Sequence, residues 1–107
     1  MTFDVIWLDS AERDLNDLAD YIAEHDSLNM AEYVVAKILD ATAALALHPD
    51  AGAYVKELES IGNREYRQVF FKPYRVIYRV AGRKVFIYIV ADGRRDLQAL
   101  LARRLLA

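Results

Sequence analysis

Residues 64–96, REYRQVFFKPYRVIYRVAGRKVFIYIVADGRRD, decide the fold class of this 107-residue chain. The stretch contains three runs rich in aromatic and β-branched residues, which predict strands at 64–71, 74–80 and 84–91. The separators between these runs are Lys72-Pro73 and Ala81-Gly82-Arg83. Proline lacks a ladder donor and glycine tolerates tight reversals, so both separators predict turns. Linkers this short allow only antiparallel pairing, and the stretch therefore predicts a three-stranded antiparallel meander.

Side chains in these runs alternate with the period of two that a strand requires. In the middle run the two faces carry Tyr74, Val76, Tyr78 and Val80 on one side and Arg75, Ile77 and Arg79 on the other. In the last run the same rule separates Val85, Ile87 and Ile89 from Phe86, Tyr88 and Val90. The alternation thus assigns half of the aromatic side chains in the sheet to the core.

The N-terminal part predicts one strand and two helices. Residues 2–8, TFDVIWL, alternate like a strand. Asp9 and Glu12 stand at capping-box spacing, which predicts a helix that starts at Asp9 and ends near His25-Asp26. A second helix begins at Ser27 or Asn29 and ends at His48-Pro49, because the residue before proline resists the α conformation. The apolar stripes at helical spacing are Ala11, Leu15, Leu18, Ala19 and Ile22, and Tyr33, Val34, Ile38, Ala41 and Leu45.

Residues 50–63 show no clear period, so we expect a loop there. The leucines after Asp92-Gly93 predict a short C-terminal helix, which either packs on the domain or keeps its leucines for a partner. This order of elements predicts an α+β fold. It comprises an N-terminal strand, an antiparallel helical hairpin on one face of the sheet, a three-stranded antiparallel meander that completes the sheet, and a short C-terminal helix. The length predicts a single domain, residues 1–107.

The charge is strongly segregated along the chain. Residues 1–62 contain three basic and thirteen acidic side chains, whereas residues 63–107 contain eleven basic and three acidic ones. Such segregation favours an anionic partner, either nucleic acid or an acidic protein segment. The structural alternative is a basic meander that complements an acidic helical layer within the fold.

Several classes of chemistry lack their sequence signals. The chain has no cysteine, no GxxxxGK[ST] or GxGxxG motif and no HExxH motif, and its two histidines, His25 and His48, lie far apart in the sequence. Nothing local positions a serine beside a histidine for nucleophilic catalysis. We therefore expect no cofactor and no metal site. Without a signal-peptide pattern or a membrane-length apolar run, the expected location is the cytoplasm.

Arginines are the main candidates for binding a partner. Planar guanidinium groups bind phosphate or carboxylate through paired hydrogen bonds. Aromatic side chains interleaved with them are suited to stacking on unpaired bases. The candidate target-binding residues are Arg67, Arg75, Arg79, Arg94 and Arg95. For Arg75 the structural alternative is a solvated strand residue, and for Arg95 it is pairing with Asp92 or Asp96.

Four segments in this order resemble the ParE/RelE toxin superfamily: IWLDSAERDLNDLADYI, HPDAG, EYRQVFFKPYRVIYRV and VADGRRDLQALLARRL. The resemblance covers nearly the whole chain. It implies the toxin of a type II toxin–antitoxin module, of the kind that stabilises plasmids. It also implies a cognate antitoxin that wraps an extended or helical tail around the hairpin and sheet.

The superfamily includes two activities. RelE-like members cut mRNA on the ribosome, and the resemblance matches Arg67, Arg75 and Arg95 to basic residues of that pattern. A second strand lysine has no counterpart here, and the catalytic tyrosine position falls near Leu100-Leu101. ParE-like members instead poison DNA gyrase and carry no recognised catalytic set. The first helix and the RRDLQALLARRL ending are closer to ParE, so gyrase is the favoured target. The alternatives are a ribosome-dependent ribonuclease and a non-toxic binding module with a basic sheet.

Overall fold

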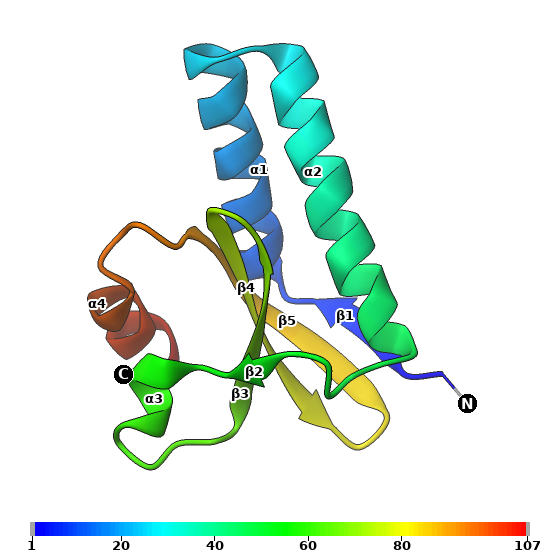
Figure 1. Cartoon of the computed structure of the whole chain (residues 1–107), viewed down its shortest axis with the longest axis vertical. Helices are drawn as coiled ribbons and strands as arrows, with labels where there is room; N and C mark the ends of the chain where they lie inside the picture. Colours follow the sequence, from blue (N-terminus) through cyan, green and yellow to red (C-terminus); the bar gives the residue numbers. More distant parts are fainter. Residues whose placement is uncertain (1, 107) are drawn as a thin grey trace.

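A computed structural model describes residues 2–106. The chain forms β1 (Asp4–Trp7), α1 (Asp9–His25), α2 (Leu28–Ala43), β2 (Ala53–Tyr54), α3 (Lys56–Glu59), β3 (Tyr66–Phe71), β4 (Tyr74–Ala81), β5 (Lys84–Asp92) and α4 (Leu97–Leu101) (Figure 1). A 3₁₀ turn at Ala44–Ala46 extends α2, and a π-helical turn at Ala102–Leu106 extends α4. The α+β class and the predicted order of elements are confirmed.

The strands form one sheet in the order β1-β5-β4-β3-β2. β3, β4 and β5 are the predicted antiparallel meander, with turns at Lys72-Pro73 and at Gly82-Arg83. Gly82 has φ +61°, a conformation that side chains with a Cβ rarely adopt, so the second turn requires glycine. β1 joins the sheet as predicted and pairs in parallel with β5. The helical hairpin returns the chain to the end of the sheet at which β1 begins, so a later strand such as β5 can run in the same direction as β1.

A β-bulge in β5 overturns the predicted alternation of that strand. Ile77 pairs with Ile89 but its neighbour Tyr78 pairs with Ile87, so Tyr88 is an extra residue without a partner on β4. Ile87 therefore faces one side of the sheet while Ile89 faces the other. The sequence prediction that these isoleucines share a face was wrong, because a strict period of two cannot register an inserted residue.

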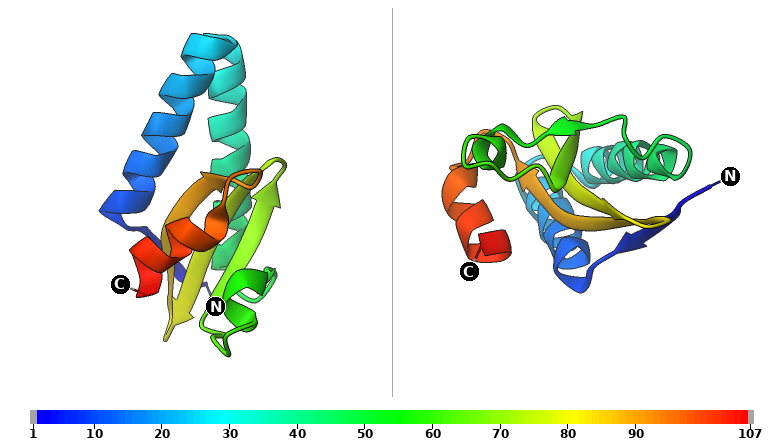
Figure 2. Two further views of the ribbon diagram at one scale, coloured as in Figure 1. Left: turned by 90° about the vertical axis from the view of Figure 1, so that its left-hand side faces the viewer. Right: turned by 90° about the horizontal axis from the view of Figure 1, so that it is seen from below.

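Both faces of the sheet are covered, and the chain has two apolar cores (Figure 2). The α1–α2 hairpin covers one face with most of its predicted stripes, burying among others Ala11, Ile22, Val34, Ile38 and Leu45. Tyr33 was predicted to belong to the second stripe but is exposed. α3 and α4 cover the opposite face. The residues of this second core include Val55, Leu58, Ile77, Ile89, Leu97, Leu100 and Leu101. Of the C-terminal leucines, Leu97, Leu100 and Leu101 thus pack on the domain, whereas Leu106 stays exposed.

Helix boundaries follow the predictions except at the start of α1 and the end of α2. The α-helix α2 ends at Ala43 and passes into the 3₁₀ turn at Ala44–Ala46, short of the predicted end at His48-Pro49. Ser27 caps α2, its hydroxyl accepting the backbone N–H of Met30 at 3.0 Å. Asp9, however, lies inside α1 rather than capping it, and the cap position is Leu8. The Leu8 N–H donates to the Ile87 carbonyl while the Leu8 carbonyl accepts from Glu12. The backbone of Leu8 is therefore held by the sheet, and the helix begins there with no side chain capping its first turn.

The predicted loop at residues 50–63 contains two short elements. β2 pairs with β3 through Ala53 opposite Gln68 and Tyr54 opposite Arg67. α3 follows directly and buries Leu58 in the second core. β2 has two residues and α3 has four, which is too short for a periodic pattern of apolar residues. They can be recognised only from their contacts with segments far away in the sequence.

Candidate arginine sites

The structure divides the five candidate arginines between the two ends of the sheet. Arg75 lies at the start of β4, and Arg94 and Arg95 follow the end of β5, which pairs there with the start of β4. Arg79 lies four residues further along β4, about 13 Å away at the usual strand rise. Arg67 belongs with Arg79, since both line one hollow at that far end. The five candidate arginines thus lie at two separate places on the sheet.

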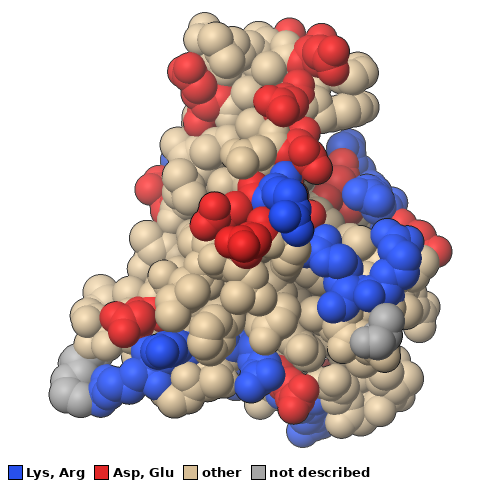
Figure 3. All heavy atoms as spheres, turned by 180° about the vertical axis from the view of Figure 1, so that it is seen from behind, with Lys and Arg blue, Asp and Glu red and all other residues tan. Residues whose placement is uncertain are grey.

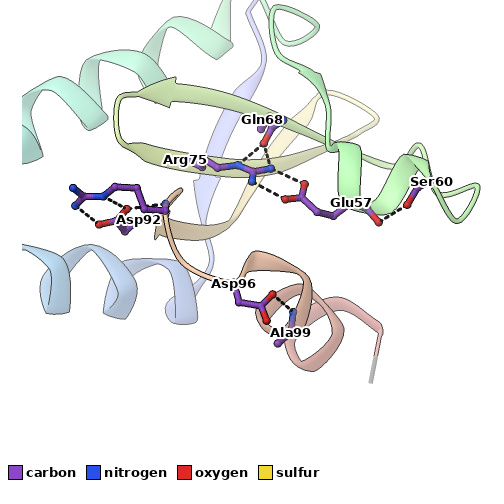
Figure 4. Close-up of polar contacts among 8 residues, drawn as sticks. Glu57, Ser60, Gln68, Arg75, Asp92, Asp96 and Ala99 are labelled. Atoms are coloured by element: carbon purple, nitrogen blue, oxygen red, sulfur yellow. Dashed lines mark hydrogen bonds and ion pairs between the residues drawn. The ribbon is translucent and has the colours of Figure 1, made fainter.

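Arg75 is the centre of a buried polar cluster (Figure 4). Its two terminal nitrogens donate to the two carboxylate oxygens of Glu57 at 2.8 and 2.9 Å. Its Nε donates to Gln68 Oε1 at 2.7 Å, and one terminal nitrogen also donates to that oxygen. The side chain of Arg75 is only 11% exposed and that of Glu57 25%. The pair ties α3 to the sheet in a geometry that is bidentate and largely shielded from water.

This ion pair shifts the titration of Glu57. The Arg75 guanidinium lowers the pKa of the Glu57 carboxyl from its ordinary value of 4.5, chiefly through the hydrogen bonds between them, against an opposing effect of burial. Glu57 therefore stays ionised at any pH near neutrality. The positive charge of Arg75 is matched inside the fold.

Two further features shape the opening around Arg75. The exposed ring of Phe70 lies 6.0 Å from the guanidinium carbon, and Gly93 lies against its stem. A Cβ on Gly93 would stand 2.8 Å from the Pro73 carbonyl oxygen and 3.0 Å from Arg75 Cδ. Glycine at this position serves close packing, because its φ is not in the positive range where glycine is favoured. A hollow of about 400 Å³ lies here, and Lys56, Lys72 and Arg94 add positive charge to its walls.

Arg94 and Arg95 take different roles. Arg94 donates to both carboxylate oxygens of Asp92, at 2.9 and 2.6 Å, and lowers the pKa of that carboxyl below its ordinary value. Arg95 donates its backbone N–H to the Asp92 carbonyl, and its side chain is exposed. Asp96 caps α4 by accepting the Ala99 N–H at 3.3 Å. Asp92 thus pairs with Arg94, and Arg95 extends its charge into solvent.

The far site is organised around Tyr54, which the sequence did not indicate. The guanidinium carbon of Arg67 lies 4.4 Å from the centroid of the Tyr54 ring, and that of Arg64 lies 5.7 Å from it. Arg79 and Glu65 line the same hollow, whose volume is about 390 Å³. Tyr54, Arg64, Glu57 and Gln68 were all missed, because pairing between segments far apart in the sequence brings them to the arginines.

Charge is segregated on the surface as well as along the chain. Figure 3 shows acidic side chains over the helical hairpin, while most of the lysines and arginines on that side gather lower down and around the C-terminal segment. The acidic layer and the basic layer therefore remain distinct surfaces. Some charges of the two layers pair with each other. Arg104, for example, donates to both carboxylate oxygens of Asp14 on α1 at 3.1 Å.

Residues 5–97 match the family model described as the ParE toxin of type II toxin–antitoxin system, parDE. The chain belongs to the ParE toxin family. Among solved structures it is similar to the chromosomal ParDE system from P. aeruginosa, with a TM-score of 0.71 and 18% identity over 84% of this chain and 95% of that one. It is also similar to the RelBE2 toxin–antitoxin complex from Mycobacterium tuberculosis, with a TM-score of 0.63 and 18% identity over 86% and 99%. No curated protein sequence gives a significant match.

In this ParE-family toxin, Leu100 and Leu101 are buried in the second core, at the position where the resemblance places a RelE-like tyrosine. Burial raises the pKa values of Tyr66, Tyr74 and Tyr78, so these phenols stay protonated near neutrality. Within residues 2–106 no group of three or more histidines, aspartates or glutamates is placed to hold a metal ion. In the same part of the toxin, no helix is long and apolar enough to cross a membrane.

The ParE-family toxin also has an apolar hollow at the tip of its hairpin. About 420 Å³ in volume, it lies between the two helices and the β3–β4 turn. Its walls include the exposed side chains of Tyr21, Met30 and Tyr33, the last with its ring edge-on to Phe71. Exposed apolar side chains continue along α2, at Leu28 and Leu39.

Proposed function

We propose that this toxin acts in the cytoplasm by binding and inhibiting DNA gyrase, without chemistry of its own. The observation that carries the proposal is the ion pair between Arg75 and Glu57. A ribonuclease needs an arginine whose charge is available to the developing phosphorane. Here the guanidinium already donates to a carboxylate and to Gln68, in a site where water is largely excluded. Arg75 is thus better explained as a structural tie than as a catalytic group.

The C-terminal helix supports the same conclusion. General base catalysis requires a titratable side chain within hydrogen-bond reach of the attacking hydroxyl. In α4, Leu97, Leu100 and Leu101 point into the second core. We therefore assign target binding to exposed charges, with Arg95 as the strongest candidate at this end of the sheet.

The neutralising partner in this proposal is a cognate antitoxin. The exposed apolar side chains of the hairpin, Tyr21, Leu28, Met30, Tyr33 and Leu39, form a larger patch than a small monomer usually leaves uncovered. Both similar solved structures are described as toxin–antitoxin systems or complexes. A partner that covers this patch raises toxin stability by mass action.

The decisive experiment compares two activities of the purified toxin. We expect inhibition of DNA supercoiling by gyrase, and no effect on protein synthesis in a cell-free translation system. In cells, induction is expected to give filamentous growth and a DNA-damage response while translation initially continues. Codon-positioned mRNA cleavage with intact supercoiling would refute the proposal.

Arg95→Ala tests the assigned surface. The side chain of Arg95 is exposed, so this substitution is expected to relieve growth inhibition while leaving the melting temperature and antitoxin binding unchanged. Arg13→Ala, an exposed arginine on α1, is the matched control and is expected to remain fully toxic. Full toxicity of Arg95→Ala would move the target surface elsewhere.

A second candidate is the RelE-like ribonuclease, favoured by the hollow beside Arg75. Lys56, Lys72 and Arg94 surround it, and the half-exposed Phe70 ring could stack on a base. In this alternative an mRNA phosphate displaces Glu57 from Arg75. The translation assay separates it from the gyrase proposal.

A further inference from the structure

We propose that Arg64 and Arg67 form a phosphate-binding site around Tyr54, at the end of the sheet away from Arg75. This site goes beyond the proposed action on gyrase and does not depend on it. The hollow between these residues measures about 390 Å³, within the range of pockets that take small molecules. Three of its seven lining residues are arginines, and Glu65 is its one acidic wall.

Arg67 is fixed in place by neutral partners. Its NH1 donates to the carbonyl of Gly52 at 2.8 Å and to that of Asp50 at 3.3 Å, while its NH2 donates to the Tyr54 hydroxyl at 3.2 Å. Its guanidinium also stacks on the Tyr54 ring. Among residues 2–106 it forms no ion pair with a carboxylate. These contacts orient the guanidinium without neutralising it. Little side-chain conformational entropy is therefore lost when an anion binds.

Arg64 brings charge that an anion can recruit. It pairs with Glu59 at 3.4 Å, but the two side chains are 69% and 40% exposed, so solvent weakens the pair and a stronger anion can replace it. Arg79 also lines the hollow and is half-buried, but it pairs with Tyr66 while Arg67 pairs with Tyr78, so its side chain leaves the opposite face of the sheet. Arg79 forms no ion pair with any carboxylate that the structure describes.

The chemistry of the hollow favours phosphate over an acidic peptide. Guanidinium forks match phosphate oxygens through paired hydrogen bonds, and a phosphate monoester offers up to two charges on one centre to several cations. The Tyr54 hydroxyl accepts from Arg67, which leaves its own proton to donate to an anion. Peptide carboxylates spaced along a chain would instead approach Glu65 and Glu59. The phosphate belongs either to a nucleic-acid backbone or to a free nucleotide.

Titration of the ¹⁵N-labelled toxin with inorganic phosphate, adenosine 5′-monophosphate, a short DNA duplex and a glutamate-rich peptide tests the site by NMR, with no gyrase present. We expect saturable shifts at Tyr54 and at the Arg67 Nε. The double variant Arg64→Gln, Arg67→Gln is expected to bind about tenfold more weakly or worse, having lost two charge-assisted contacts. Glu65→Gln removes the repelling wall and is expected to bind more tightly than the parent.

Two controls keep the result interpretable. Arg103→Gln, an exposed arginine of the C-terminal turn, changes the net charge by the same amount as Arg64→Gln alone and is expected to leave binding unchanged. Arg64→Gln alone replaces the double variant if thermal melts show that the latter does not fold.

The outcomes distinguish the source of the phosphate. Binding of phosphate and the mononucleotide but not the duplex supports the proposal and identifies a free nucleotide. Duplex binding whose salt dependence falls by about two phosphate contacts in the double variant supports it and identifies the nucleic-acid backbone. Binding of the acidic peptide alone, no saturation by any probe, or equal loss in Arg103→Gln would overturn it.

Discussion

Removing Glu57 is the sharpest test of how this fold is held together. Glu57→Ala leaves the Arg75 guanidinium, 11% exposed, without its carboxylate. Breaking a fully buried ion pair by deleting one partner costs about 3–5 kcal/mol. Gln68 still accepts from Arg75 in the variant, and the 25% exposure of Glu57 lets water enter its place. We therefore expect about half of that cost, roughly 2 kcal/mol, and a melting temperature lower by on the order of 10 °C.

Urea denaturation of a double-mutant cycle separates the pair from its surroundings. The cycle combines Glu57→Ala with Arg75→Met, which keeps an unbranched stem beside Gly93. We expect the double variant to be more stable than the sum of the single losses implies, by about 1 kcal/mol or more, because no charge is then left unpaired. A Glu57→Ala variant within 0.5 kcal/mol of the parent, or strictly additive losses, would refute the reasoning.

Lowering the pH tests the same ion pair between Arg75 and Glu57 without leaving the cavity that Glu57→Ala creates. Because the pKa of Glu57 is lower in the folded toxin than its ordinary value of 4.5, its ionisation stabilises the fold above about that pH. This contribution declines as the pH falls below 4.5 and is gone once the pH passes below the folded-state pKa. In Glu57→Gln this part of the pH dependence is expected to disappear, leaving the contribution of Asp92, whose pKa is also lowered. Parallel stability curves for the parent and Glu57→Gln between pH 5 and pH 3 would contradict it.

Other contacts carry further predictions. Tyr78→Phe removes a buried hydroxyl that donates to the Pro49 carbonyl at 2.8 Å and accepts the Gly52 N–H at 2.9 Å, so we expect a loss of about 1–3 kcal/mol in urea denaturation. Gly52→Ala is expected to destabilise by more than 1 kcal/mol, because its Cβ would stand 2.5 Å from a backbone oxygen; an unchanged melting temperature would contradict the packing described. Asp14→Ala releases Arg104, and hydrogen exchange is expected to become faster in the C-terminal turn than in α1.

The sequence predicted the parts of the fold that local pattern controls. The meander with its turns at Pro73 and Gly82 was confirmed, as was the Ser27 cap. Periodicity failed where one residue was inserted, at Tyr88 in the bulge of β5. It also failed at β2 and α3, which exist only because β3 and the second core lie beside them.

The candidate sites were harder to predict than the fold. The sequence offered Arg75 as either a target contact or a solvated residue, whereas the structure buries it against Glu57, 18 residues away. Gln68, which the sequence did not indicate, accepts from the same guanidinium. Local patterns reveal which side chains carry charge. Which charges cancel one another depends on chain pairings that no local pattern contains.

The position of β1 beside β5 governs when this toxin can fold. Asp4 pairs with Lys84 and Trp7 with Ile87, so the first strand has no neighbour until nearly the whole chain has been synthesised. Until then the apolar stripes of α1 and α2 lack the sheet that covers them. Closing so long a loop is slow, and the waiting fragment is prone to aggregation. A nascent chain that has not yet reached residues 84–87 therefore cannot complete the sheet on which the toxin fold depends.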